Sequence, residues 1–191
     1  SGVYPPASTF KPFVALSGLA EGGFSASETV FCPGAFKLGN RIFRCWRKWG
    51  HGKEDVVEAL RDSCDVYFYQ MGLRIGIDRM LDWASRFGFG ERTGIDLPGE
   101  AAGNVAGREW KKRRVGENWY PGDTVNYSIG QGYLLATPIQ MARSYAPLAT
   151  GGLLPTPHLV EGTAPAPVDL ELPASALASI RKGLEAVVGT K

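Results

Sequence analysis

The sequence has no apolar run long enough to cross a membrane and no pattern of an amino-terminal signal peptide. Its longest apolar stretches are interrupted by charged residues or proline well before the ~20 residues that a membrane-spanning helix requires. A strong charge imbalance is also lacking, because 21 Lys and Arg stand against 19 Asp and Glu. The one basic run, at 111–114, is interpreted as a solvated face. We therefore expect no membrane span within these residues and no nucleic-acid partner.

Internal repeats and low-complexity tracts are missing as well, and 191 residues fit one globular domain. The 25 glycines and 13 prolines favour turns and ordered loops over a helical bundle. Residues 24–52 are expected to form turns and short strands, 99–127 to be mostly loop, and 153–160 to form a strand. Hydrophobic periodicity and capping residues predict the following helices: 8–20, 54–62, 65–71, 79–87, 137–150 and 174–187. The fold class is thus mixed α/β.

Ser8 and Lys11 lie three positions apart at the start of the first predicted helix. Residues at i and i+3 share one helix face, with Cβ atoms about 5–6 Å apart. Serine needs a base to act as a nucleophile, and lysine serves as a base only when burial lowers its pKa. The apolar stretch after Lys11 could bury it. Ser8 and Lys11 are therefore interpreted either as a nucleophile with its base or as part of an ordinary helix start.

Ser63 and Asp65 flank Cys64 between two predicted helices, where a loop can direct side chains into a cleft. In an extended segment the first and third side chains point to the same side. Ser63 could then relay a proton, and Asp65 could orient Lys11 or a substrate amide. The simpler alternative is that Ser63 caps the following helix and Asp65 is an acidic residue of its first turn.

The sequence lacks any C-x-x-C pair, yet it contains three cysteines and a histidine at the spacing C-x12-C-x5-H-x12-C. Three readings stay open: a disulfide between Cys32 and Cys45, three buried reduced thiols, or a structural zinc site with Cys32, Cys45, His51 and Cys64 as ligands. Side chains alternate in direction along an extended segment, so Cys64 should point to the side opposite Ser63 and Asp65. It should therefore face away from the cleft and toward residues 32–52. A metal there would brace the loop that carries Ser63 and Asp65.

Several ordered motifs of the chain resemble those of the class B penicillin-binding proteins, and most closely the elongation-type members of that family. The match begins with the S-x-x-K of Ser8 and Lys11 and the S-x-[ND] of Ser63 and Asp65. The further matching segments are YPPASTFKP (4–12), WRKWGHG (46–52), FGFGERTGIDLPGE (87–100), REWK (108–111) and SIGQG with ATPIQM (128–132 and 136–141).

The resemblance implies a penicillin-binding, transpeptidase-like fold with helices packed on an antiparallel sheet. It implies a serine-type D,D-transpeptidase that cross-links peptidoglycan stem peptides in cell elongation and is acylated by β-lactams. Ser8 would be the acylated nucleophile, Lys11 its general base and Ser63 a proton shuttle, while Asp65 stands where many relatives have Asn. No cofactor is required for this chemistry.

Two departures from the family pattern matter. Ala7 stands where Gly is usual, and the third family motif, K-[ST]-G, is absent from these residues. That motif lies on a strand that supplies one oxyanion-hole amide, and losing one such donor costs ~10²–10³ in rate. We therefore expect residues 1–191 to be a partial transpeptidase domain with a truncated sheet and little activity of its own.

By resemblance, the parent protein is anchored in the cytoplasmic membrane by a segment outside this chain. Its domain then lies on the periplasmic side and works with a membrane glycosyltransferase of the shape, elongation and division family. A β-lactam sensor or non-catalytic scaffold is the alternative from another functional class, and a serine β-lactamase is a third. The class A β-lactamase segment E-x-x-L-N is absent, which favours slow deacylation.

Overall fold

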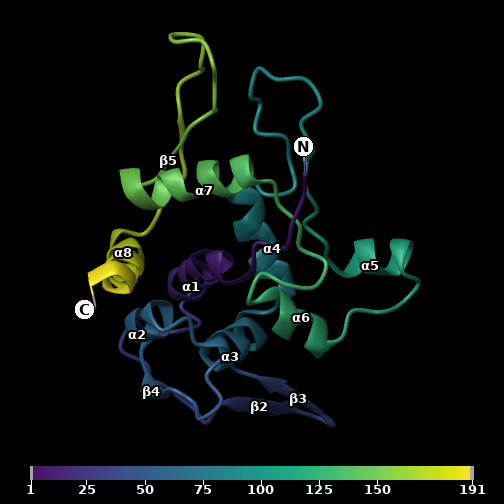
Figure 1. Ribbon diagram of the computed structural model, residues 1–191, viewed down its shortest axis with the longest axis vertical. Helices are drawn as coiled ribbons and strands as arrows, with labels where there is room; N and C mark the ends of the chain where they lie inside the picture. Colours follow the sequence, from purple (N-terminus) through teal and green to yellow (C-terminus); the bar gives the residue numbers. More distant parts are fainter. Residues whose placement is uncertain (1, 190–191) are drawn as a thin grey trace.

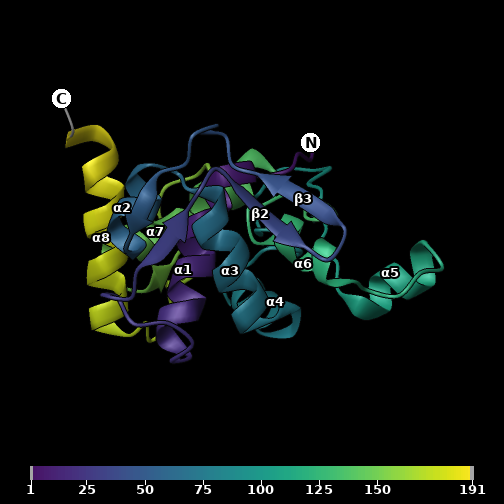
Figure 2. The ribbon, with the colours of Figure 1, turned by 90° about the horizontal axis from the view of Figure 1, so that it is seen from below.

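Helix α1 (Lys11–Ala20) lies at the centre of the computed structural model, which describes residues 2–189 (Figures 1 and 2). The 3₁₀ turn η1 (Ala7–Phe10) leads directly into it, so the helix predicted at 8–20 is confirmed. All residues from Lys11 to Gly18 are buried. A helix buried on every side is apolar all round, which explains the sequence PFVAL after Lys11.

Helices surround α1 and carry the rest of the core. α1 packs against α2 (Val56–Arg61), α3 (Asp65–Ile75), α4 (Ile77–Arg86) and α8 (Ala174–Gly189). A cluster of aromatic rings fills the space beside it, with edge-to-face ring centroids 4.9–5.6 Å apart: Phe10, Phe13, Phe87, Phe89 and Tyr127. Such contacts add to the free energy gained by burying the rings.

The strands form antiparallel pairs, each two-stranded in the part of the chain that the structure describes. β1 (Val30–Cys32) pairs with β4 (Gly52–Glu54), and β2 (Ala35–Leu38) pairs with β3 (Arg41–Arg44). β5 (Leu153–Leu154) pairs with β6 (Val168–Asp169). Strands β1, β2 and β3 contact α3 (Figure 1). The predicted turns and short strands at 24–52 and the mixed α/β class are confirmed.

Two expectations were wrong in part. The region 99–127 contains α5 (Arg108–Arg114) and α6 (Pro121–Tyr127). The first has a run of charges without apolar periodicity, and the second is held by tertiary packing against α3. The strand expected at 153–160 is limited to Leu153–Leu154, because only these residues find a partner strand.

Helix α7 (Pro138–Thr150) begins where the sequence predicts, at the N-cap Thr137. The Thr137 Oγ1 accepts a hydrogen bond from the backbone of Gln140 at 3.1 Å, and the Gln140 side chain accepts one from the backbone of Thr137 at 2.8 Å. This reciprocal capping box starts a helix from local sequence alone. The Gln140 amide also donates to the carbonyls of Glu91 and Ala102, which fixes the preceding loops.

Candidate active site and cysteine cluster

Ser8 lies on the exposed turn η1, immediately before the buried helix α1. Its neighbour Ala7 has a left-handed backbone with φ 51°, and the Ala7 N–H donates to the Gly130 carbonyl at 2.8 Å. A Cβ at Gly130 would lie 2.2 Å from the Ala7 carbonyl oxygen, so only glycine fits there. The segment 128–132 therefore holds the turn that presents Ser8.

Lys11 points its ammonium group at the segment 63–65 from the first position of α1. Its side chain is 2% exposed, and Nζ donates to the Ser63 carbonyl at 2.7 Å, to Ser63 Oγ at 3.0 Å and to Asp65 Oδ1 at 2.7 Å. These contacts use all three donors of an ammonium group. The structure thus brings Lys11, Ser63 and Asp65 together, while the Ser8 hydroxyl has no hydrogen-bond partner among the described residues.

Ser63 reaches Lys11 through an unusual backbone conformation and not through an extended segment. Its φ is 52°, in the left-handed region, and the extended N-cap of α3 is Cys64. The Ser63 side chain does not cap α3, so the capping alternative is wrong for Ser63, whereas Asp65 does lie in the first turn. A left-handed non-glycine residue costs of the order of 1–3 kcal/mol and is frequent at functional sites.

Trp46 secures this segment, and the sequence motifs did not point to it as a site residue. Its backbone N–H donates to Asp65 Oδ2 at 3.0 Å, and its indole N–H lies 3.0 Å from the Asp62 carbonyl and 3.2 Å from the Ser63 carbonyl. The Ser63 carbonyl therefore accepts hydrogen bonds from both Trp46 and Lys11. The available signal was a tryptophan directly beside a cysteine of the predicted cluster.

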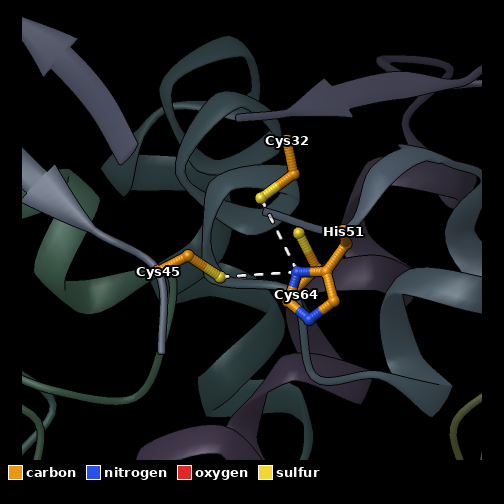
Figure 3. A group of neighbouring side chains, drawn as sticks. All are labelled: Cys32, Cys45, His51 and Cys64. Carbon is orange, nitrogen blue, oxygen red and sulfur yellow. Dashed lines mark hydrogen bonds between the residues drawn. The ribbon is translucent and has the colours of Figure 1, made fainter. Parts of the chain in front are cut away.

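In the cysteine cluster, Cys64 of the same segment lies against residues of 32–52, as expected. The three sulfurs and a nitrogen of His51 all lie within 4.8 Å of one another (Figure 3). His51 Nδ1 is 3.6 Å from the Sγ atoms of both Cys32 and Cys45. All three thiols are buried and free, so the structure contains no Cys32–Cys45 disulfide.

The donor set and its spacing suit a tetrahedral zinc ion. With Zn–S about 2.3 Å and Zn–N about 2.0 Å, neighbouring nitrogen and sulfur ligands lie about 3.5 Å apart. Hydrogen bonding with Cys64 and with backbone groups of Arg47, Asp65 and Val66 holds the pKa of Cys45 below its ordinary value, whereas the same bond with Cys45 and burial raise the pKa of Cys64. A thiolate is the form that binds a metal. Burial raises the pKa of Glu54, beside Cys64, to about 7.

Comparison with known families and proteins agrees with the resemblance seen in the sequence. Residues 1–191 match the family model described as the penicillin binding protein transpeptidase domain. The chain is 47% identical over 165 residues to peptidoglycan D,D-transpeptidase MrdA of Escherichia coli strain K12, covering 85% of this chain and 26% of that protein. The corresponding protein of Haemophilus influenzae is 45% identical over 84% of this chain and 25% of its own length. The chain thus spans about a quarter of these relatives.

Solved structures show the same fold. The penicillin-binding protein PBP2 of Helicobacter pylori, in a complex with MreC, has a TM-score of 0.94 and 38% identity over 100% of this chain and 36% of that one. PBP2 of Pseudomonas aeruginosa, in complex with WCK 5153, has a TM-score of 0.90 and 40% identity over 98% of this chain and 45% of that one. The expected fold is therefore confirmed.

Proposed function

The chain belongs to the penicillin-binding protein transpeptidase family, and on that basis we propose that it carries the nucleophile of a peptidoglycan D,D-transpeptidase of cell elongation. The Ser8 hydroxyl attacks the carbonyl of a D-Ala-D-Ala stem peptide. An ester to Ser8 forms, and the terminal D-Ala leaves with the proton from the serine. The amine of a second stem peptide then takes the acyl group, and Ser8 regains its proton. A β-lactam opens its ring on Ser8 and stays attached as an ester.

The contacts of Lys11 are the observation that supports this proposal. Lys11 is the base assigned to the Ser8 proton, and Ser63 Oγ, 3.0 Å from Lys11 Nζ, is placed to pass a proton toward the leaving amine. Asp65 holds Lys11 in place through the 2.7 Å contact. The backbone N–H of Ser8 supplies one donor to the oxyanion that forms during attack.

Labelling with a fluorescent penicillin tests the nucleophile. We expect covalent label on the wild-type chain and none on Ser8→Ala, whereas Ser25→Ala, a serine on an exposed turn, keeps the wild-type rate. Label that persists on Ser8→Ala contradicts the assignment. The rate of deacylation then distinguishes the alternatives: rapid turnover indicates a β-lactamase, and a stable ester that no amine can take indicates a sensor.

We further propose that residues 1–191 form only part of the transpeptidase domain. The support is the absence of K-[ST]-G from the sequence, together with relatives of whose length the match covers only about a quarter. A chain extended through a K-[ST]-G segment is expected to label at least ~10²-fold faster than the 191-residue chain. Equal rates would contradict this division of the domain.

The proposed substrates and inhibitors are peptidoglycan stem peptides and β-lactams. The proposed partner is a membrane glycosyltransferase of the shape, elongation and division family, on the periplasmic side of the cytoplasmic membrane. One similar solved structure (TM-score 0.86, 34% identity) is described as "Structural coordination of polymerization and crosslinking by a peptidoglycan synthase complex". In residues 2–189 no helix combines the length and the apolarity that crossing a membrane needs. Co-purification of the parent protein with the glycosyltransferase tests the partnership.

Cys32, Cys45, His51 and Cys64 are proposed to bind a structural zinc ion, which would link strands β1 and β4 to the start of α3. Cys64 lies between the two residues that contact Lys11, so a metal there restrains the site without taking part in the chemistry. Metal analysis of the purified protein is expected to find one zinc per chain and far less in Cys32→Ser. A wild-type chain purified without stoichiometric zinc contradicts the proposal.

A further inference from the structure

Positive charge is concentrated in residues 29–53, which we call the basic segment. It contains six Lys and Arg and no Asp or Glu, whereas the other 166 residues carry 15 Lys and Arg and 19 Asp and Glu. All six cations are exposed, and none forms an ion pair within residues 2–189: Lys37, Arg41, Arg44, Arg47, Lys48 and Lys53. Such a concentration in a nearly neutral protein attracts anionic ligands.

Two exposed tryptophans lie among these cations. Trp46 is 65% exposed and Trp49 is 85% exposed, and Lys48 Nζ lies 5.0 Å from the Trp49 ring centroid. Tryptophan is enriched at binding surfaces, where its face contacts apolar groups and its N–H remains available. Indole faces stack on the C–H faces of sugar rings, and arginine binds carboxylates through two parallel hydrogen bonds. The combination therefore suits an anionic saccharide polymer.

The basic segment continues directly into the candidate active site. Trp46 donates to Asp65 and to the Ser63 carbonyl, which also accepts from Lys11. Hairpin β2–β3 is fixed to α3 because the Tyr69 hydroxyl donates to the Arg44 carbonyl at 3.0 Å and its ring contacts Phe43. A ligand on the basic segment is thus held on a rigid surface that leads to Ser63.

We propose that Arg44, Arg47, Lys48 and Trp49 bind a peptidoglycan strand, with the cations on stem-peptide carboxylates and the indole on a sugar ring. This inference rests on the proposed function, since it names the polymer that the site acts on. The alternative ligand is an anionic membrane, which the same cations and the same indole would contact. A peptidoglycan strand is favoured over a membrane because the surface borders the segment 63–65. A bilayer lying on the same face would cover that segment.

Sedimentation with purified peptidoglycan sacculi tests the surface with the chain as it is. The double variant Arg47→Glu/Lys48→Glu is expected to bind sacculi about tenfold more weakly than the wild type, and Trp49→Ala several-fold more weakly. The matched control Arg113→Glu/Arg114→Glu makes the same charge change on α5, and it should bind within twofold of the wild type. Zinc content and melting temperature of each variant show whether it is folded.

Four results would overturn the proposal. In the first, the double variant binds sacculi as well as the wild type does. In the second, the α5 control weakens binding as much as the double variant. In the third, the change affects binding to phosphatidylglycerol vesicles but not to sacculi. Sacculi whose carboxylates have been chemically amidated should bind the wild type more weakly, and undiminished binding also contradicts the proposal.

The binding and labelling measurements separate this inference from the proposed function. If the chain extended through K-[ST]-G binds sacculi through Arg47 and Lys48 but takes no penicillin label, the proposed chemistry is rejected and the binding surface is kept. If penicillin labels Ser8 but sacculus binding does not depend on Arg47 and Lys48, only the proposed binding surface is rejected.

Discussion

At the scale of single residues, Lys11 is the most constrained side chain of the candidate site. It is a buried cation whose three donors all point at residues 52 to 54 positions away, and Phe68 lies under it at 5.5 Å. A buried cation without a partner is strongly destabilising. Asp65 therefore has a structural role toward Lys11 in addition to any contact with a substrate amide.

Asp65→Ala is expected to lower the free energy of unfolding by about 3 kcal/mol, because it leaves Lys11 buried without its carboxylate. Asp65→Asn keeps an acceptor oxygen and should cost less. Urea unfolding measures both. The control is Asp78→Ala, which breaks the exposed ion pair with Arg108 and should cost less than ~1 kcal/mol. A cost for Asp65→Ala no greater than that of the control contradicts the argument.

Glu100 predicts a pH dependence of stability. Burial opposes its ionisation, but hydrogen bonds from Thr93 and Gly94 outweigh burial and hold the pKa of Glu100 below its ordinary value. A lowered pKa in the folded state stabilises the protein above the ordinary Glu pKa, and this stability is lost as the pH falls through the folded value.

Glu100→Gln should therefore reduce the free energy of unfolding by about 1 kcal/mol at pH 7, a value that allows for solvent screening. The difference from the wild type should be smaller at pH 3 than at pH 7. Urea unfolding at both pH values measures it, with the exposed Glu161→Gln as control. A difference that is constant with pH contradicts the predicted role of the carboxylate.

At the scale of elements, α3 connects the candidate site to the rest of the core. Its first residue is Asp65, its preceding residue is the metal-ligand candidate Cys64, and its later turns pack on α6. The contact with α6 is close, because a Cβ at Gly72 would lie 2.4 Å from the Cβ of Ser128. Ser128 begins the segment 128–132 that holds the turn of Ser8, so this contact aligns the two halves of the site.

Gly72→Ala is expected to destabilise the protein by about 1–3 kcal/mol, since the added methyl group has no space. Helix propensity alone predicts the opposite sign, a gain of about 0.5–1 kcal/mol. The control Gly189→Ala, at the end of α8 with no atom within 4 Å, should be neutral or slightly stabilising. Thermal unfolding compares them, and a more stable Gly72→Ala protein contradicts the packing argument.

At the scale of the whole molecule, the cysteine cluster joins segments from three places in the chain. Cys32 belongs to β1, Cys45 and His51 to the loop between β3 and β4, and Cys64 to the residue before α3. The same loop holds Trp46 against Ser63. A metal at the cluster would therefore stabilise the short strands and the site together.

Removal of the proposed zinc by a strong chelator is expected to lower the melting temperature by roughly 5–10 °C, because a cross-link among three segments is lost. Added Zn²⁺ should restore the original value, and Cys32→Ser should show the lower melting temperature with no response to chelator. Circular dichroism follows the transition. An unchanged melting temperature after verified loss of zinc contradicts the proposed structural role.

Local sequence determined those features whose physical cause lies within one helical turn. The i, i+3 relation puts Ser8 and Lys11 at one helix start, and Thr137 with Gln140 starts α7 through a capping box. Motif spacing indicated the family and the composition of the cysteine cluster. The predicted roles of Ser8, Lys11, Ser63 and Asp65 remain predictions.

Only the tertiary structure decided which distant groups meet. Lys11 contacts Ser63 and Asp65, which lie more than 50 positions away in the sequence. Trp46 donates a hydrogen bond to the Asp62 carbonyl, 16 positions away. The left-handed backbone of Ser63 depends on these long-range contacts. Helices α5 and α6 were missed for the same reason, since seven-residue helices are too short to form without packing. Caps and periodicity act through adjacent turns, whereas these contacts depend on how the finished elements pack.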